Sequence, residues 1–277
     1  MYRPTELRHF LDSLGTSPKK KLSQNFLIDG NIVRKMVSSS DVHPDDVVLE
    51  IGPGPGVLTQ TLLQAGATVI AVEKDPVLAK ALERFQNDNL FVYIDDILQV
   101  PLKEILKKTK KTKVIANLPY HITTPVLTHL LPHNELFSSI IVMVQKEVAE
   151  RFTASPHSKN YSSITIFLQF YSKIEFLFKV SRSCFYPEPK VDSAVIRFDL
   201  REPPHDVDPE PFFHMVRCAF GQRRKMLRSS LSHLAPQAVV LEALERSRIL
   251  PESRPEELSL EQFLLLHQNL KKYRITL

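Results

Sequence analysis

Short apolar runs alternate along the first half of the chain with segments whose apolar residues recur at helical spacing. Strands are predicted for the apolar runs at 47–51, 68–73, 90–94, 113–117 and 138–145. Helices are predicted over 57–66, which ends on a glycine, and over 76–85, which has a proline in its first turn. This alternation predicts βαβ units, and therefore an α/β fold with a mainly parallel, doubly wound, Rossmann-like sheet. The segments 174–180 and 191–200 alternate more strictly and are expected to add an antiparallel edge.

The pattern changes at REPPHDVDPEP (201–211), an acidic and proline-rich stretch that is typical of a linker. The strand pattern is absent beyond it. Four segments instead have the apolar spacing of amphipathic helices: FFHMVRCAF, RRKMLRSSLSHL, VVLEALERSRI and LEQFLLLHQNLKKY. We therefore expect a first domain over 1–204, with an N-terminal lid over 1–30, and a small helical domain over 205–277.

Composition narrows the class of protein. With 43% hydrophobic and 24% charged residues the chain is expected to be globular, and no apolar run is long enough to span a membrane. The first residues include acids and no apolar run, so no signal peptide is expected. Cys184 and Cys218 form no CxxC pair and the histidines have no metal-ligand spacing, so we expect no disulfide, no metal and a cytoplasmic location. The net charge of +5 is a weak indication of a polyanionic partner.

Glycine is scarce, yet three of the seven glycines fall in Gly52-Pro53-Gly54-Pro55-Gly56, between a predicted strand and a predicted helix. Ligands bind at this position in doubly wound folds. Dinucleotide sites use GxGxxG and present backbone N–H groups to phosphate, whereas here two loop residues are prolines, which have no N–H. The loop therefore favours close backbone approach to a ligand without phosphate.

Carboxylates follow the next two predicted strands. Glu73 lies 21 residues after Gly52, where an acid can accept hydrogen bonds from both ribose hydroxyls of a nucleoside. Asp95 and Asp96 end the third strand, where a carboxylate can accept from an adenine amino group. Either acid alone is also typical of an ordinary strand-end cap. Together with the phosphate-poor loop, they favour S-adenosylmethionine as the cofactor.

The tetrapeptide Asn117-Leu118-Pro119-Tyr120 ends the fourth strand. The Asn117 amide oxygen and the Leu118 carbonyl can each accept a hydrogen bond from an amino group on a planar base, and Tyr120 offers a face for stacking. An Asn-x-Pro turn after a strand is also common without function. His121 follows it, and with no partner visible in the sequence we interpret it as a turn residue.

At these residues the sequence resembles a known family, the ribosomal RNA adenine N6-dimethyltransferases, and most closely their KsgA type. The resemblance rests on eight segments: LSQNFLID (22–29), EIGPGPGVLT (50–59), VIAVEKD (69–75), DDIL (95–98), ANLPYHITTPVL (116–127), MVQKEVAERF (143–152), FYPEPKVDSAVIRF (185–198) and FGQRRKMLRSSL (220–231). It implies a class I S-adenosylmethionine methyltransferase sheet with a small all-helical C-terminal domain. One departure is Ser23, where the family usually has glycine, so the turn before Asn25 is expected to differ slightly.

The resemblance also implies roles for individual residues. The cofactor-binding set is Asn25, Leu27, Gly52, Gly54, Glu73, Lys74, Asp96 and Asn117. The catalytic set is Asn117, Leu118, Pro119, Tyr120 and Phe185, with Tyr120 and Phe185 holding the target adenine between their rings. Arg223, Arg224, Lys225 and Arg228 are expected to lie on one helix and to contact RNA. The lysine-rich run 103–113 is interpreted either as a second RNA contact or as a solvated face.

The implied reaction is dimethylation of two adjacent adenines near the 3′ end of the 16S rRNA in the small ribosomal subunit, which would make that subunit the partner of a monomeric enzyme. Two alternatives stay open. One is methylation of a different nucleic acid, large-subunit rRNA or DNA. The other is a ribosome-assembly or transcription factor that binds the cofactor without using it.

Overall fold

The computed structural model describes residues 2–106, 111–222 and 225–272. Its chain divides into two compact units, the first formed by Met1–Ala149 and Ile174–Leu200 and the second by Glu150–Lys173 and Arg201–Leu277. In the part of the chain that the structure describes, no helix is long and apolar enough to cross a membrane.

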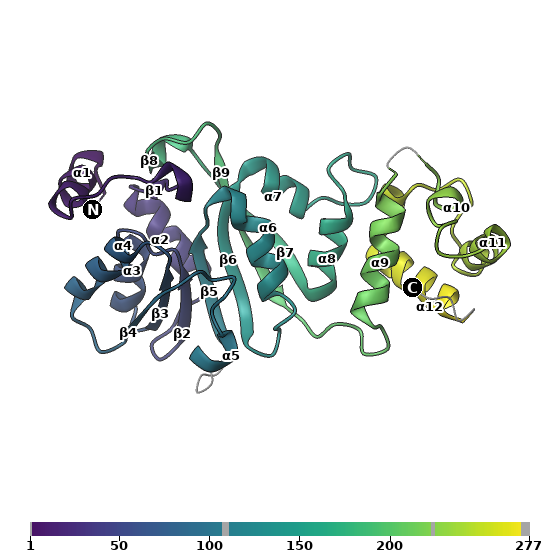
Figure 1. Ribbon diagram of the computed structural model, residues 1–277, viewed down its shortest axis with the longest axis horizontal. Helices are drawn as coiled ribbons and strands as arrows, with labels where there is room; N and C mark the ends of the chain where they lie inside the picture. Colours follow the sequence, from purple (N-terminus) through teal and green to yellow (C-terminus); the bar gives the residue numbers. More distant parts are fainter. Residues whose placement is uncertain (1, 107–110, 223–224, 273–277) are drawn as a thin grey trace. The chain divides into compact units, whose positions relative to one another are not determined.

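The first unit is built on one mixed sheet with strand order β4-β3-β2-β5-β6-β9-β7 (Figure 1). The strands are β2 (Val47–Ile51), β3 (Thr68–Glu73), β4 (Leu90–Ile94), β5 (Thr112–Asn117), β6 (Phe137–Gln145), β7 (Ser172–Val180) and β9 (Ser193–Leu200). Those from β2 to β6 pair in parallel, and β9 runs antiparallel to β6. The doubly wound sheet and its antiparallel addition are thereby confirmed. The order reverses between β2 and β5, so a ligand site is expected at their carboxyl ends.

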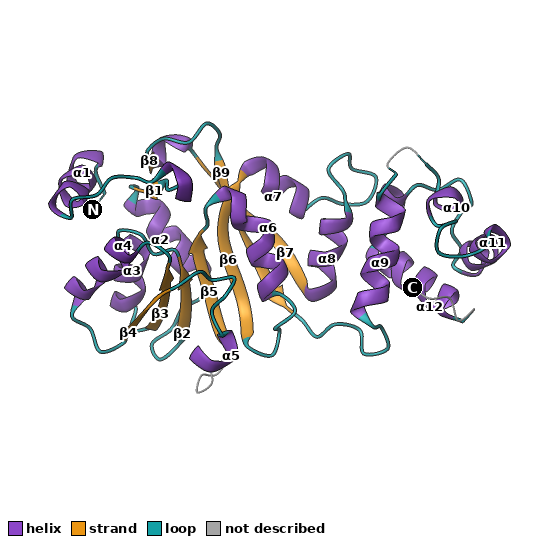
Figure 2. Ribbon diagram, in the orientation of Figure 1, coloured by secondary structure: helices purple, strands orange, loops and turns teal. Residues whose placement is uncertain are grey.

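Helices cover both faces of this sheet (Figure 2). The helices of this unit are α2 (Gly30–Ser39), α3 (Val57–Gln64), α4 (Pro76–Ala81), α5 (Leu102–Ile105) and α6 (Thr123–Leu130), and α7 (Lys146–Phe152) begins in it and ends in the second unit. The predicted helix over 76–85 is α-helical only to Ala81 and continues as the 3-10 turn η2 (Leu82–Phe85). One hydrophobic core, which includes Val33, Val48, Leu62 and Val69, lies between α2, α3 and the sheet.

The N-terminal segment packs onto the first unit through a small second sheet. Helix α1 (Pro4–Ser13) leads through the turn η1 (Lys20–Leu22) to β1 (Phe26–Leu27), which pairs antiparallel with β8 (Phe185–Tyr186) after the turn η4 (Arg182–Cys184). Leu7 and Leu11 of α1 pack with Phe26, Ile28 and Leu78. The residues between α1 and β1 are thus fixed at both ends against the body of the unit.

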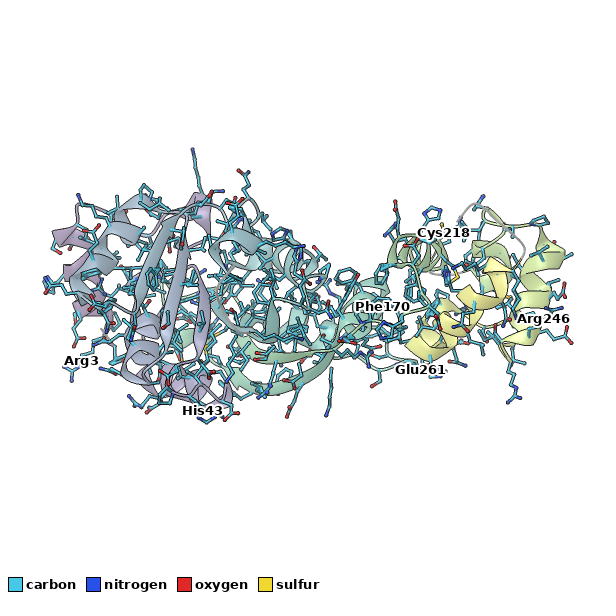
Figure 3. The ribbon with its side chains drawn as sticks, turned by 90° about the horizontal axis from the view of Figure 1, so that it is seen from below. Arg3, His43, Phe170, Cys218, Arg246 and Glu261 are labelled. Carbon is cyan, nitrogen blue, oxygen red and sulfur yellow. The ribbon has the colours of Figure 1, made fainter. Side chains whose placement is uncertain are left out.

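The second unit is helical. It contains α8 (Ser163–Tyr171), α9 (Pro209–Phe220), α10 (Leu227–Ser230), α11 (Gln237–Arg246), η5 (Pro255–Glu257) and α12 (Leu260–Lys271). Three of the four helices predicted after the linker are confirmed as α9, α11 and α12, whereas in the segment predicted over 223–234 the described residues are helical only in α10. The division of the chain differs from the expected boundary at 204/205, because α8 belongs with the C-terminal helices. The ring of Phe170 (labelled in Figure 3) stacks on that of Phe212, with 5.3 Å between the ring centroids. The ring centroids of Phe167 and Phe213 are 4.9 Å apart.

Candidate active site

A pocket opens at the carboxyl ends of β2, β3, β4 and β5, the place that the strand order indicates. Most of the sequence-predicted site residues line it: Asn25, Gly52, Gly54, Glu73, Lys74, Asp96, Asn117, Leu118, Pro119 and Tyr120. Asp95 and His121 line it as well, His121 within the turn η3 (Tyr120–Ile122). Leu27 and Phe185 do not belong to the lining.

The glycine loop needs glycine for its backbone conformation. Gly52, Gly54 and Gly56 have φ angles of 64°, 55° and 77°, in the left-handed region that side chains disfavour. A Cβ at Gly56 would lie 2.7 Å from Leu82, whereas one at Gly52 would meet nothing within 4 Å. Gly56 is therefore required by packing, while the open side of Gly52 is a place where a ligand can approach the backbone.

The N–H groups of this loop are directed into the protein. Gly52 donates to the Val72 carbonyl at 2.9 Å, Gly54 to the Glu73 carboxylate at 3.0 Å and Gly56 to the Pro53 carbonyl at 2.9 Å. The two prolines have no N–H. The five-residue loop thus directs no backbone donor at a ligand phosphate. The three glycines add to the two prolines in this respect, because their N–H groups are already bonded within the protein.

Glu73 lies at the end of β3 with only 5% of its surface exposed. Its Oε2 accepts from Gly54 N and its Oε1 accepts from Asp75 N at 2.8 Å. Burial raises the pKa of Glu73, although both backbone hydrogen bonds oppose that shift. Each carboxylate oxygen has a further lone pair, so the side chain is held in place and can still accept hydrogen bonds from two ribose hydroxyls.

Asp96 lies across the pocket and is paired with Lys74. The Lys74 Nζ is 2.7 Å from Asp96 Oδ2, and Leu98 N donates to Asp96 Oδ1 at 3.1 Å. The hydrogen bond from Lys74 lowers the pKa of Asp96, which burial alone would raise. Asp96 is thus kept as an ionised acceptor, as an adenine amino group requires, and Lys74 acts here through Asp96.

Asn117 ends β5 with its side-chain orientation determined by the N-terminal segment. Its Nδ2 donates to the backbone carbonyl of Asn25 at 3.1 Å. A carbonyl can only accept, so the amide nitrogen must face Asn25, and the amide oxygen of this pocket-lining residue is left available as an acceptor. This is the orientation that a target amino group needs.

Tyr120 is held by a residue that the sequence analysis did not single out. Its hydroxyl lies 2.8 Å from the hydroxyl of Ser193, which is fully buried at the start of β9. Burial raises the pKa of Tyr120, so the phenol stays protonated. Ser193 lies within the segment FYPEPKVDSAVIRF (185–198), one of those on which the family resemblance rests.

Phe185 does not reach the pocket. It is 3% exposed and packs in the hydrophobic core of the first unit together with Leu27. The reason is the β1–β8 register, which places Leu27 and Phe185 opposite each other. The structure therefore brings Tyr120 to the pocket without Phe185, and base stacking by Phe185 stays a prediction.

Ser23 adopts φ 49° and ψ 39°, the left-handed conformation that favours glycine. Its backbone carbonyl accepts a hydrogen bond from the side-chain nitrogen Nδ2 of Asn25 at 3.1 Å. The turn before Asn25 is therefore formed by serine in a conformation more typical of glycine.

The structure describes two of the four residues that are expected to bind RNA. Arg223 and Arg224 lie outside the described residues. Arg228 lies in α10, but Lys225 precedes it, so the expected single helix is wrong: Met226 is extended, with φ −69° and ψ 153°, and no helix continues through it. In the lysine-rich run, Lys113 is bound within the first unit, 2.8 Å from Asp46, while 107–110 lie outside the described residues.

Glu50 and Asp75 were also not singled out, although they lie in the quoted segments EIGPGPG and VIAVEKD. Glu50 is buried in β2, just before the glycine loop in sequence, and Asp75 is the N-cap of α4. Within the described ranges, no group of three histidine, cysteine or acidic side chains is arranged to hold a metal ion, and Cys184 and Cys218 are both free thiols.

Known proteins match the chain over nearly its whole length. A family model described as ribosomal RNA adenine dimethylase matches residues 15–272. A protein of Protochlamydia amoebophila named ribosomal RNA small subunit methyltransferase A is 55% identical, over 98% of this chain and 97% of its own. The protein of the same name from Chlamydia muridarum is 45% identical, over 97% of this chain and 98% of its own.

Two solved structures are similar to the chain. A dimethyladenosine transferase from Plasmodium falciparum has a TM-score of 0.80 at 28% identity, covering 90% of this chain and 98% of its own. The 23S rRNA methyltransferase ErmE has a TM-score of 0.70 at 28% identity, covering 89% of this chain and all of its own.

Proposed function

The chain belongs to the ribosomal RNA adenine dimethylase family, and we propose that it transfers methyl groups from S-adenosylmethionine to the N6 atoms of two adjacent adenines near the 3′ end of 16S rRNA. The observation that carries this proposal is the Asn117 amide. It ends β5 at the switch point of the sheet, beside the glycine loop, and its oxygen is left as an acceptor in the pocket.

The pocket residues fit the cofactor. The sulfonium group of S-adenosylmethionine supplies the methyl group, and the remainder of the cofactor is a good leaving group. Gly52 offers open backbone to the methionine part, Glu73 accepts from the ribose hydroxyls, and Asp96 accepts from the adenine amino group. Asn25 and Leu27 belong to the N-terminal segment that closes this site.

The work of the chain on the target base is positioning. The N6 lone pair of adenine is delocalised into the ring, so the amino nitrogen is a poor nucleophile. Hydrogen bonds from its two protons to the Asn117 amide oxygen and the Leu118 carbonyl favour a more tetrahedral nitrogen, which frees the lone pair. Pro119 fixes the backbone between Leu118 and Tyr120, and Tyr120 stacks on the base. Positioning of this kind contributes about 7–11 kcal/mol to lowering a barrier.

The small subunit is the favoured substrate. Relatives named small subunit methyltransferase A match at 45–55% identity over nearly all of both chains, whereas the large-subunit enzyme ErmE matches at 28%. The enzyme acts as a monomer in the cytoplasm, and its positive side chains at Arg223, Arg224, Lys225 and Arg228 contact the rRNA of that subunit.

Methyl transfer to immature small subunits from cells that lack the activity tests the proposal. With labelled S-adenosylmethionine we expect dimethyladenine at two adjacent positions near the 3′ end of 16S rRNA. The Asn117→Ala variant, with its fold intact, should lose nearly all transfer. Product on large-subunit rRNA or DNA would move the assignment to another substrate, and subunit binding without transfer would show a binding-only factor.

A further inference from the structure

A short stretch of the N-terminal segment, Lys19 to Asn25, borders the pocket and is called the arm here. Lys21, Gln24 and Asn25 belong to the pocket lining. The arm is folded on itself: Leu22 N donates to the Lys19 carbonyl at 3.0 Å, and Lys19 N donates to the Gln24 side-chain oxygen at 2.8 Å. It therefore moves as one piece, and whatever holds Lys19 and Gln24 holds the whole arm.

The side chains of Lys19 and Gln24 both bind the carboxylate of Asp75. The Lys19 Nζ lies 2.8 Å from Asp75 Oδ2, and the Gln24 Nε2 donates to the same oxygen at 3.2 Å. The Asp75 side chain is 1% exposed, whereas that of Lys19 is 41% exposed. Burial would raise the pKa of Asp75, but the hydrogen bonds from Lys19, Gln24 and Val77 N, together with the positive charge of Lys19, hold that pKa below its ordinary value. A buried carboxylate that loses its partners is strongly unfavourable.

Asp75 is also bound to the cofactor side of the pocket. Its backbone N–H donates to Glu73 Oε1, while Glu73 Oε2 accepts from the glycine loop at Gly54. At the other end of the arm, the Asn25 carbonyl orients the amide of Asn117. One connected set of hydrogen bonds thus joins the arm to the ribose acid, the glycine loop and the catalytic amide.

We propose that Asp75 is a positioning residue that holds the arm closed over the cofactor pocket through Lys19 and Gln24. The cofactor then leaves only when these two interactions break, and the same closure orients Asn117 for the target base. Asp75 is not part of the pocket lining and acts through the arm. The identity of the cofactor rests on the proposed function, whereas the closure of the arm does not.

Two single variants separate this role from the fold of α4. Lys19→Met breaks the interaction from the arm side and leaves Asp75 untouched. Asp75→Ser is too short to reach the arm but preserves an N-cap, since Asp75 Oδ1 accepts from Val77 N and serine serves well at that position. Lys20→Met is the matched control, because it removes the same charge one residue along and Lys20 makes no ion pair with any described side chain.

The first measurement is S-adenosylmethionine dissociation by stopped flow, without RNA. We expect release about tenfold faster in Lys19→Met and in Asp75→Ser, and within about twofold of wild type in Lys20→Met. The double variant should be no faster than Asp75→Ser, because that single variant already removes the interaction with Lys19. In turnover, KM for the cofactor should rise about tenfold, and kcat at saturating cofactor should also fall, because an open arm no longer orients Asn117.

The second measurement is trypsin cleavage in the arm of the unliganded protein, which tests the closure independently of the cofactor. Cleavage should be faster in Lys19→Met than in Lys20→Met, which keeps the same number of cleavable lysines in the arm. It should also be faster in Asp75→Ser than in the wild type, since both keep all three lysines. Wild-type release and cleavage rates in both variants, or effects that multiply in the double variant, would overturn the proposal. A wild-type protein that binds no S-adenosylmethionine would instead refute the proposed function, and the cleavage rates would still decide the role of Asp75.

Discussion

Replacing Glu50 by glutamine should remove a loss of stability that the wild-type protein undergoes as the pH rises. Glu50 lies within the buried part of β2 with 1% exposure, and its Oε2 accepts from the Thr59 hydroxyl at 2.6 Å. Its Oε1 has no hydrogen-bond partner among the described residues. Burial raises the pKa of Glu50 to about 8, with the Thr59 hydrogen bond opposing and the nearby Glu73 adding to the shift.

The sign follows from proton binding. The unfolded chain releases the Glu50 proton near pH 4.5, and the folded protein releases it near pH 8. Between these values the folded protein holds one more proton than the unfolded chain, so the free energy of unfolding falls by about 1.4 kcal/mol per pH unit. The stability from the neutral acid is fully present below pH 4.5 and is lost as the pH rises through 8, a total of about 5 kcal/mol.

Urea unfolding followed by circular dichroism at pH 5.5 and 7.5 tests this. The difference in free energy of unfolding between Glu50→Gln and wild type should shift by about 3 kcal/mol in favour of the variant over that range. The constant cost of burying the glutamine amide cancels in this shift, as do other titrating groups. Thr59→Val should move the wild-type window to higher pH, because it removes a hydrogen bond that favours the ionised form. A difference that is independent of pH would refute the reasoning.

Four further predictions follow from single contacts. Glu73→Ala should weaken S-adenosylmethionine binding about 10–100-fold, from lost hydrogen bonds to a charged group, and unchanged affinity by calorimetry would remove Glu73 from the site. Ser193→Ala should lower kcat about fivefold through the loss of the Tyr120 hydrogen bond while leaving cofactor affinity at the wild-type value; an equal loss in a Tyr120→Phe/Ser193→Ala double variant would confirm a shared interaction. Ser23→Gly should raise the free energy of unfolding by about 1 kcal/mol, because glycine accepts the left-handed conformation; a lower urea midpoint would contradict this. Burial lowers the pKa of His267, so its contribution to stability is present above pH 6.5 and is lost as the pH falls; His267→Leu should reduce that acid sensitivity, measured by thermal unfolding at pH 5 and 7.5.

The strands, the glycine loop and the tetrapeptide at 117–120 were predictable because their signals are local. Apolar periodicity decides which residues are buried in a strand, and a loop with alternating prolines loses N–H donors wherever it is placed. The order of acids at successive strand ends indicated a nucleoside site, since parallel strands bring their carboxyl ends to one edge of a sheet. The family resemblance rests on the same short segments.

Tertiary structure decided what depends on partners far apart in the chain. Lys19 and Asp75 meet because the arm folds back over β3, and no local pattern contains that pairing. Phe185 lies in the core because β8 pairs with β1, a register that its aromatic character does not encode. Helix α8 belongs with the C-terminal helices because its phenylalanines pack on those of α9. Sequence alone thus determined which chemistry is present and at which strand ends, while the pairing of distant segments determined which of those groups are held, oriented and covered.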